Sequence, residues 1–318
     1  MSAAVRKTRE RLRRARDRWI DQTLLQVEAA RVAIARGEAD VLLLGDSSCL
    51  TLAHEDTDRR LLPELLAEAT GARVVTVANA GFNGWLYAAV LRVLAQLEQR
   101  PRAVIATASI RTCTATHVIA HPVYSYPRTL AALDRIRHGE RRIRAFGRGG
   151  TSWDPDRIAE FRRIEVTTRW GGTRTIGDHL APLDGAGPPP WPLELERARW
   201  DYFHGEELLA GNPGLGGLTL LGERLADYGV PALVNWTQLP VAHGETLFPG
   251  EFEGHARANL ARFEQALRLA DHGLPPLLKP ALDIPDFQDA RNGTEHYAFS
   301  GRAKVARAMA DAVAENLG

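Results

Sequence analysis

The feature that most constrains the fold is a strand–loop–helix unit that occurs three times between residues 41 and 111. Each unit begins with a short apolar run, at 41–44, 74–77 and 103–107. These runs show no polar alternation, which is typical of strands covered on both faces. Strands that alternate with helical stretches in this way predict a parallel sheet with helices on both sides.

The same pattern returns near the C-terminus. Further strands are predicted at 231–236 and, more weakly, at 280–284. Helices are predicted at 57–69, 85–98, 217–228, 251–271 and 299–316. We therefore expect an α/β fold, a three-layer α/β/α sandwich with a flavodoxin-like parallel sheet of about five strands.

Two segments lie outside this framework, and we expect one domain over 1–318 that carries both. Residues 4–37 have helical spacing and predict an N-terminal helical arm, 1–38, whose basic stretch at 6–18 we interpret as a solvated face rather than a phosphate or membrane contact. Residues 112–215 are rich in Gly, Pro and aromatics, with helices predicted at 129–145 and 155–166. We interpret 112–215 as an insertion that covers the carboxyl edge of the sheet, and call it the cap segment.

Charge and cysteine content exclude several classes of protein. The 318 residues include 40 Lys+Arg and 39 Asp+Glu, so bulk positive charge for nucleic-acid binding is absent. Two cysteines make neither a disulfide scaffold nor a cysteine-rich zinc site. The sequence contains no apolar stretch that predicts a membrane span or a signal peptide, so the expected location is the cytoplasm. The sequence leaves the oligomeric state open.

Polar loops follow the first three predicted strands, where ligands bind in open α/β sheets, and the first two of these loops contain glycine. Ser47 lies at the turn after the first strand, and His296 precedes the last helix. A serine at such a turn is exposed near a helix N-terminus, and a histidine from a neighbouring strand end can reach it. This is an arrangement of nucleophile and base.

These residues resemble the SGNH (GDSL) hydrolase superfamily. The resemblance rests on Gly45-Asp46-Ser47 after the first strand, Asn-x-Gly-x-x-Gly over 79–84 after the second, and His296 followed by Gly301. The stretch from Phe287 to His296 looks like an expanded form of the Phe-x-Asp-x-x-His block of that superfamily. The resemblance covers about 40–111 and 217–318, and not the cap segment.

The resemblance implies a role for each matching residue. Ser47 is expected to be the nucleophile and His296 the base. The backbone N–H groups of Ser47 and Gly81 are expected to donate to the oxyanion, whereas Asp46 is expected to fix the turn.

The third block of the superfamily, Gly-x-Asn-Asp, is absent. Its Asn supplies an oxyanion donor, but this chain has Ala-Ser-Ile-Arg at 108–111. Arg111, Ser109 or Asn83 could supply the donor instead. Arg111 also suits a substrate carboxylate or phosphate, or an acid of the protein across the cleft.

The acid of the triad is also displaced. The superfamily places an Asp three residues before the base, where this chain has Gly293. Asp289 matches the Asp of the block if four residues are inserted after it, and Asp286 and Glu295 are its rivals. The side chain of Glu295 is expected to point away from the adjacent His296. A Ser–His dyad without an acid is the remaining alternative.

The predicted function is therefore serine-dependent acyl chemistry on a small-molecule ester or thioester, by hydrolysis or by transfer to an acceptor, with no cofactor or metal. A non-catalytic binding module that keeps the fold is the alternative, and a phosphate or nucleotide binder is a third. His117 and His121 follow the third strand and could contact substrate. The tryptophans of the cap segment could line an acyl pocket, although we favour a place in its core.

Overall fold

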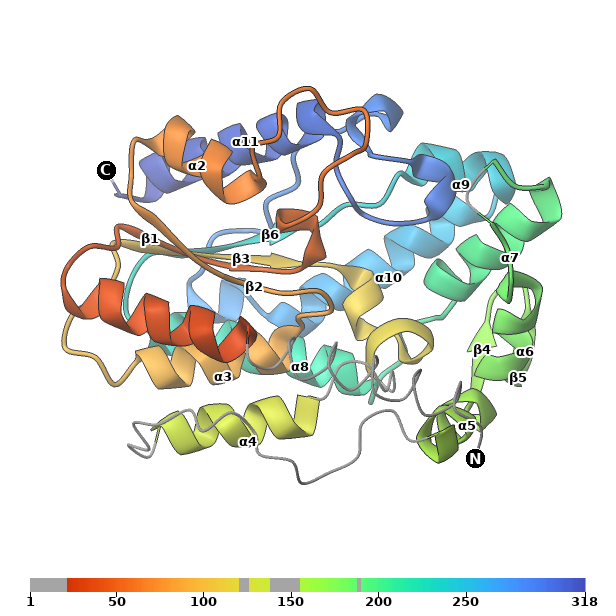
Figure 1. The fold of residues 1–318 in the computed structure, drawn as a ribbon, viewed down its shortest axis with the longest axis horizontal. Coiled ribbons are helices and arrows are strands. Elements are labelled where there is room, and N and C mark those ends of the chain that lie inside the picture. Colours follow the sequence, from red (N-terminus) through yellow and green to blue (C-terminus); the bar gives the residue numbers. More distant parts are fainter. Residues whose placement is uncertain (1–21, 120–125, 138–154, 188–189, 318) are drawn as a thin grey trace, which may run out of the picture.

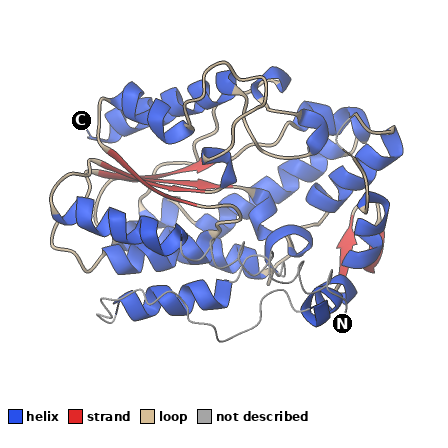
Figure 2. Cartoon of the chain, in the orientation of Figure 1, coloured by secondary structure: helices blue, strands red, loops and turns tan. Residues whose placement is uncertain are grey.

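The structure is a computed structural model, and it describes residues 22–119, 126–137, 155–187 and 190–317. Its centre is a parallel four-stranded sheet in the order β2-β1-β3-β6. The strands are β1 (Val41–Gly45), β2 (Val74–Ala78), β3 (Ala103–Ala108) and β6 (Ala232–Trp236). The predicted three-layer α/β/α class is confirmed, because helices cover both faces of this sheet (Figure 2).

Alternate residues of each strand explain the two helical layers. In β1, Leu42 and Leu44 enter one hydrophobic core and Val41 and Leu43 enter the other, and all four are fully buried. One layer contains α2 (Leu62–Thr70) and α11 (Phe299–Leu317). The other contains the helical residues 22–35, α3 (Gly84–Leu94), α8 (Pro213–Asp227) and α10 (Phe252–Leu267). A strand with two buried faces needs an apolar residue at every position, which is why the runs show no polar alternation.

The predicted fifth strand at 280–284 is wrong. In its place, only Leu278 pairs with the sheet edge, through an isolated parallel bridge to Asn235. The Leu278 N–H donates to the Val234 carbonyl at 2.9 Å, and the Trp236 N–H donates to the Leu278 carbonyl at 3.0 Å. Prolines at 275, 276 and 280 remove backbone donors on both sides of Leu278, so a longer ladder cannot form.

Most of the segment between β3 and β6 lies beyond the carboxyl ends of the strands (Figure 1). Its elements there are α5 (Pro155–Arg163), the antiparallel hairpin of β4 (Glu165–Thr168) and β5 (Gly172–Thr175), α6 (Ile176–Leu180) and α7 (Leu193–His204). By contrast, α4 (Tyr126–Arg137) lies along α3. The short α9 (Val241–Leu247) follows β6.

Two predicted helices of the cap segment differ from those observed. The helix predicted at 155–166 ends at Arg163, and the hairpin that begins at Glu165 was not predicted. Of the helix predicted at 129–145, the part after residue 137 lies outside the described residues, as do residues 1–21 of the predicted N-terminal arm. The described part of that arm is helical over 22–35.

Candidate active site

Ser47 is presented by a tight turn that Asp46 holds in place. Ser47 is the first residue of a short 3₁₀ helix, Ser47–Cys49, and Asp46 is its N-cap. The Asp46 carboxylate accepts from the Ser48 N–H at 2.8 Å and from the Ser48 hydroxyl at 2.6 Å. Gly45 is required here because a Cβ would lie 2.6 Å from Cys49 Sγ. The turn therefore places Ser47 in the lining of the pocket. Asp46 is buried, and burial raises the pKa of its carboxyl group.

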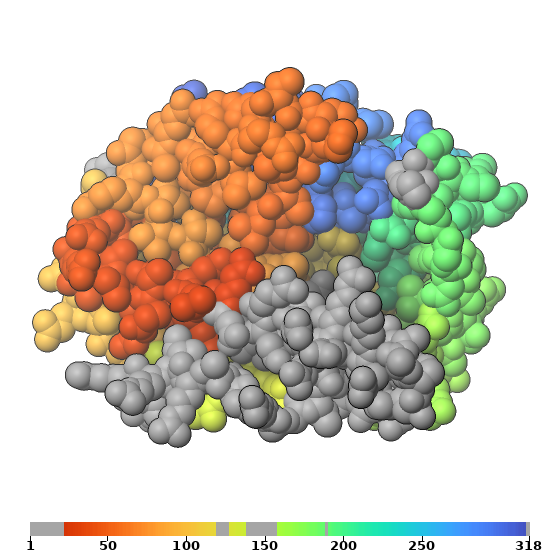
Figure 3. Space-filling model, viewed as in Figure 1, coloured from red at the N-terminus to blue at the C-terminus, as the bar shows by residue number. Residues whose placement is uncertain are grey.

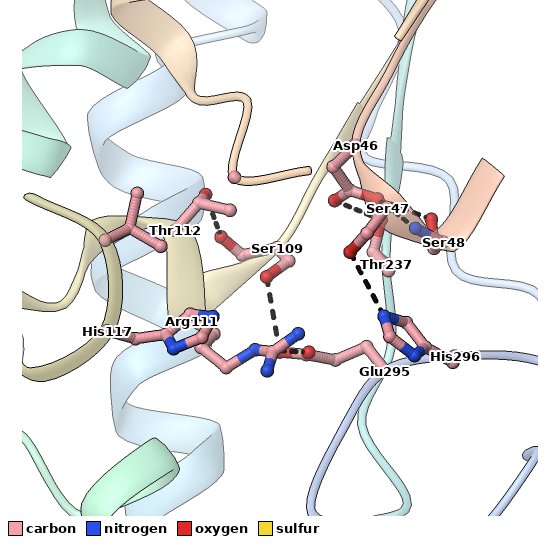
Figure 4. Close-up of a pocket in the computed structure, with 12 residues that line it drawn as sticks. Asp46, Ser47, Ser48, Ser109, Arg111, Thr112, His117, Thr237, Glu295 and His296 are labelled. Carbon is pink, nitrogen blue, oxygen red and sulfur yellow. Dashed lines mark hydrogen bonds and ion pairs between the residues drawn. The ribbon is translucent and has the colours of Figure 1, made fainter. Parts of the chain in front are cut away.

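His296 reaches this serine from the loop before α11. His296 Nε2 lies 3.1 Å from Ser47 Oγ, as Figure 4 shows. The backbone of His296 is fixed because the Gln288 N–H donates to its carbonyl at 2.8 Å, within a short antiparallel contact between Phe287 and Tyr297. Burial, followed by the nearby Arg111 charge, lowers the pKa of His296 to about 3, so the imidazole is neutral near pH 7.

None of the three carboxylates considered as the triad acid hydrogen-bonds to His296 among the described residues. Asp289 instead caps a 3₁₀ turn, accepting from the Arg291 N–H at 3.1 Å. Asp286 is paired with Lys304 at 2.6 Å. Glu295 points away from His296, as expected, and toward Arg111 (Figure 4). The described geometry is that of a Ser–His pair.

Arg111 and Glu295 form an ion pair in the same pocket. Arg111 Nε lies 2.6 Å from Glu295 Oε2, and their side chains are 8% and 2% exposed. The Ser109 hydroxyl donates to the other carboxylate oxygen at 3.2 Å. Burial raises the pKa of Glu295, and the Arg111 charge opposes that rise. Arg111 therefore has an acid of the protein as its partner, which was one of the three alternatives for it.

The candidate oxyanion donors differ in position. The Ser47 N–H donates to no protein acceptor among the described residues, as is usual at the start of a helix. Gly81, at φ +73°, lines the pocket with Ser47. Asn83 does not line it, because Asn83 caps α3 and accepts from the Leu86 N–H at 3.2 Å.

A small pocket surrounds these groups, with an empty volume of about 320 Å³ that includes space open to solvent. Its lining joins the strand-end loops to the cap segment, which supplies Thr112, His117 and Val118. Thr237 also lines it and was missed in the sequence, although it follows β6 directly and the rule of strand ends would have found it. His121 lies outside the described residues.

The three tryptophans of the cap segment that the structure describes do not line this pocket, and Trp153 lies outside the described residues. Trp200 is fully buried in the core, and Trp170 stacks on Phe248 with ring centroids 3.9 Å apart. Trp191 lies beside the Arg199 guanidinium, 4.9 Å from ring centroid to Cζ. Trp200 therefore belongs to the main core and Trp170 packs against it, whereas Trp191 lies in no core cluster of the described residues, so the predicted place in the core of the cap segment is not what is observed.

Other residues that could carry chemistry have structural partners. Asp56 forms a buried ion pair with Arg302 at 2.6 Å. Burial raises the pKa of Cys49 and of Cys113 to about 12, so neither thiol is reactive near pH 7. Over the part of the chain that the structure describes, no group of three His, Cys, Asp or Glu side chains could hold a metal ion. No helix within the same residues has the length and apolarity to cross a membrane.

No protein-family model matches the chain, and no curated protein matches it.

Proposed function

We propose that the chain is a serine-dependent acyl hydrolase or acyltransferase whose nucleophile is Ser47 and whose base is His296. The observation that carries this proposal is the 3.1 Å approach of His296 Nε2 to Ser47 Oγ at the start of a short helix. These two residues are 249 positions apart in the chain, and the loops after the four strands together with the loop before α11 bring them and their neighbours into one pocket. The resemblance of the same positions to the SGNH hydrolases supports the same chemistry.

The reaction begins when Ser47 Oγ attacks the carbonyl carbon of an ester or thioester and its proton passes to His296 Nε2. The Ser47 N–H donates to the oxyanion, and the Gly81 N–H is the second donor that the resemblance implies. Such a donor contributes about 3 kcal/mol to the stability of the transition state. The imidazolium then gives its proton to the departing alcohol or thiol, which leaves an acyl-Ser47 ester. Water, or a hydroxyl or amine acceptor, resolves this ester by the reverse sequence.

The electrostatics of the pocket fit a dyad with a weak base. A triad carboxylate stabilises the imidazolium, but here the guanidinium of Arg111 acts on His296 and disfavours it. Glu295 pairs with this guanidinium, so little of its charge is left for the oxyanion or for a substrate carboxylate or phosphate. The proposed enzyme therefore combines a weak base with backbone donors at the oxyanion.

A fluorophosphonate probe tests the proposal, because it reacts covalently with activated serines. We expect the probe to label the wild-type protein at pH 8 and to leave Ser47→Ala unlabelled, with the site confirmed by peptide mass spectrometry. Ser300→Ala is the matched control, since Ser300 is an exposed serine outside the pocket, and it should be labelled like the wild type. A folded wild-type protein that resists the probe would favour the alternative, a binding module that keeps the fold.

A further inference from the structure

Three side chains of α7 bind three consecutive carbonyl oxygens of the loop that carries His296. The Trp200 Nε1–H donates to the Arg291 carbonyl at 3.2 Å, and the Arg199 Nε–H donates to the Asn292 carbonyl at 2.9 Å. His204 Nε2 lies 2.7 Å from the Gly293 carbonyl oxygen. Figure 3 shows the green surface of the cap segment directly beside the blue surface of the segment that leads into α11. This contact joins the cap segment to the base.

The backbone conformation of Gly293 and its lack of a side chain allow this contact with α7. Its φ of +64° belongs to the left-handed region, which favours glycine. A Cβ on Gly293 would lie 3.3 Å from the Phe203 ring and 3.4 Å from Trp200 Nε1, so any side chain would press on α7. Gly293 is also the position where the resemblance places the triad acid. In this chain that position is used for docking on α7 instead of for a carboxylate.

The loop is held on a second side immediately before the base. Glu295 is fixed by the ion pair with Arg111, and the His296 carbonyl accepts from the Gln288 N–H. Only three peptide bonds separate the docked Gly293 from His296, so movement of the 291–293 carbonyls would turn the imidazole away from Ser47. A triad acid prevents this movement by a hydrogen bond to the ring itself, which the described residues do not supply.

We propose that α7 positions His296 through Trp200, Arg199 and His204, and so takes over the orienting part of the role that a triad acid has in other serine hydrolases. The inference rests on the proposed function, since orienting His296 matters only if His296 is the base for Ser47. The three α7 residues are positioning residues that act through the loop backbone. Trp200 is fully buried, so its effect cannot come from contact with substrate.

Two matched pairs of variants test this inference. Trp200→Phe removes the indole donor and keeps an aromatic ring, and Trp170→Phe is its control because the Trp170 indole donates at 3.3 Å to Glu251, away from the base loop. Arg199→Met removes a guanidinium donor, and Arg197→Met is its control, since Arg197 lies on the same helix and its Nε–H donates at 2.9 Å to the Leu247 carbonyl.

The measurement is the rate constant for labelling of Ser47 by the fluorophosphonate, well below each melting temperature and across pH. We expect Trp200→Phe and Arg199→Met to label about fivefold more slowly at every pH, the size of one lost hydrogen bond, without a shift of the pH profile. Amide hydrogen exchange at 293–295 should be faster in the same two variants. Both controls should label at the wild-type rate.

The outcomes separate the inference from the proposed function. If the wild type reacts and all four variants label at its rate, α7 is structural only and the inference is overturned. The same holds if each control slows as much as its partner. A wild type that never reacts overturns the proposed function itself.

Discussion

Glu295 and His296 are adjacent in the chain, yet their side chains serve different partners: Glu295 lies 2.6 Å from Arg111, and His296 lies 3.1 Å from Ser47. The carboxylate nearest to the base in sequence is therefore used to neutralise a buried guanidinium. Because Glu295 compensates Arg111, one small pocket can hold both the guanidinium and the neutral imidazole of His296.

Asp289→Asn should change the labelling rate of Ser47 by less than about threefold, because the lost charge makes no contact with His296 and the remaining amide oxygen can still cap the 3₁₀ turn. The measurement is the rate of fluorophosphonate labelling at pH 8, with His296→Ala as the reference for complete loss of the base. A loss of a hundredfold or more in Asp289→Asn would contradict the dyad and restore Asp289 as the triad acid.

The labelling rate should stay nearly constant between pH 7.5 and 5.5. The pKa of His296 is lowered to about 3, so the base stays neutral across this range. An ordinary histidine, with a pKa of 6.5, would lose about tenfold of its neutral form over the same two units. A tenfold fall in rate with a midpoint near pH 6.5 would show that the imidazole is far better solvated than its burial indicates.

The same pKa predicts a loss of stability in acid. Because His296 stays neutral when folded and gains a proton near pH 6.5 when unfolded, acid favours the unfolded chain. Its contribution should fall by about 2 kcal/mol from pH 7 to pH 5. The check is urea unfolding at both pH values, where His296→Asn should lose that much less stability than the wild type. The exposed His54→Asn variant controls for removal of a histidine, and equal pH slopes in all three proteins would contradict the prediction.

Removing one member of the buried ion pair should cost more than removing both. Glu295→Gln leaves the Arg111 charge uncompensated at 8% exposure, so we expect a loss of about 3–5 kcal/mol in the free energy of unfolding. Adding Arg111→Met in the same chain should recover much of that loss, because neither charge of the Arg111–Glu295 pair then remains. Urea unfolding of both single variants and the double variant measures the coupling, and strictly additive losses would show that the two groups act independently.

The local sequence pattern was enough to predict the features that depend on residues close together in the chain, above all the strands of the central sheet. The strands at β1, β2, β3 and β6 were found because continuous apolar runs are needed where both faces are buried. Ser47 directly follows β1 and His296 lies in the loop before α11, and both of these places were predicted from the sequence.

The rest depends on contacts between distant residues, which no local pattern encodes. The pairing of Arg111 with Glu295 and the docking of Gly293 on α7 join segments that are far apart in the chain. The prediction of a fifth strand was wrong for a local reason. Its apolar residues suited a strand, but the prolines around Leu278 leave too few backbone N–H donors for a ladder of hydrogen bonds.

The shape of the pocket predicts a preference for short acyl groups. The volume of about 320 Å³ includes its opening, and His117 and the fully buried Val118 form part of its wall from the cap segment. With p-nitrophenyl esters, kcat/KM should be highest for acetate and propionate and should fall steeply for octanoate, because the lining among the described residues is mostly polar and offers a long chain little apolar surface. His117→Ala enlarges the pocket without changing the Ser47–His296 pair. This variant should raise kcat/KM for the longer ester relative to acetate. Its rate of Ser47 labelling should stay within about twofold of the wild-type rate. Equal loss for every chain length in His117→Ala would mean that His117 supports the reacting atoms rather than the acyl group. A wild type that prefers octanoate would place the acyl group outside this pocket.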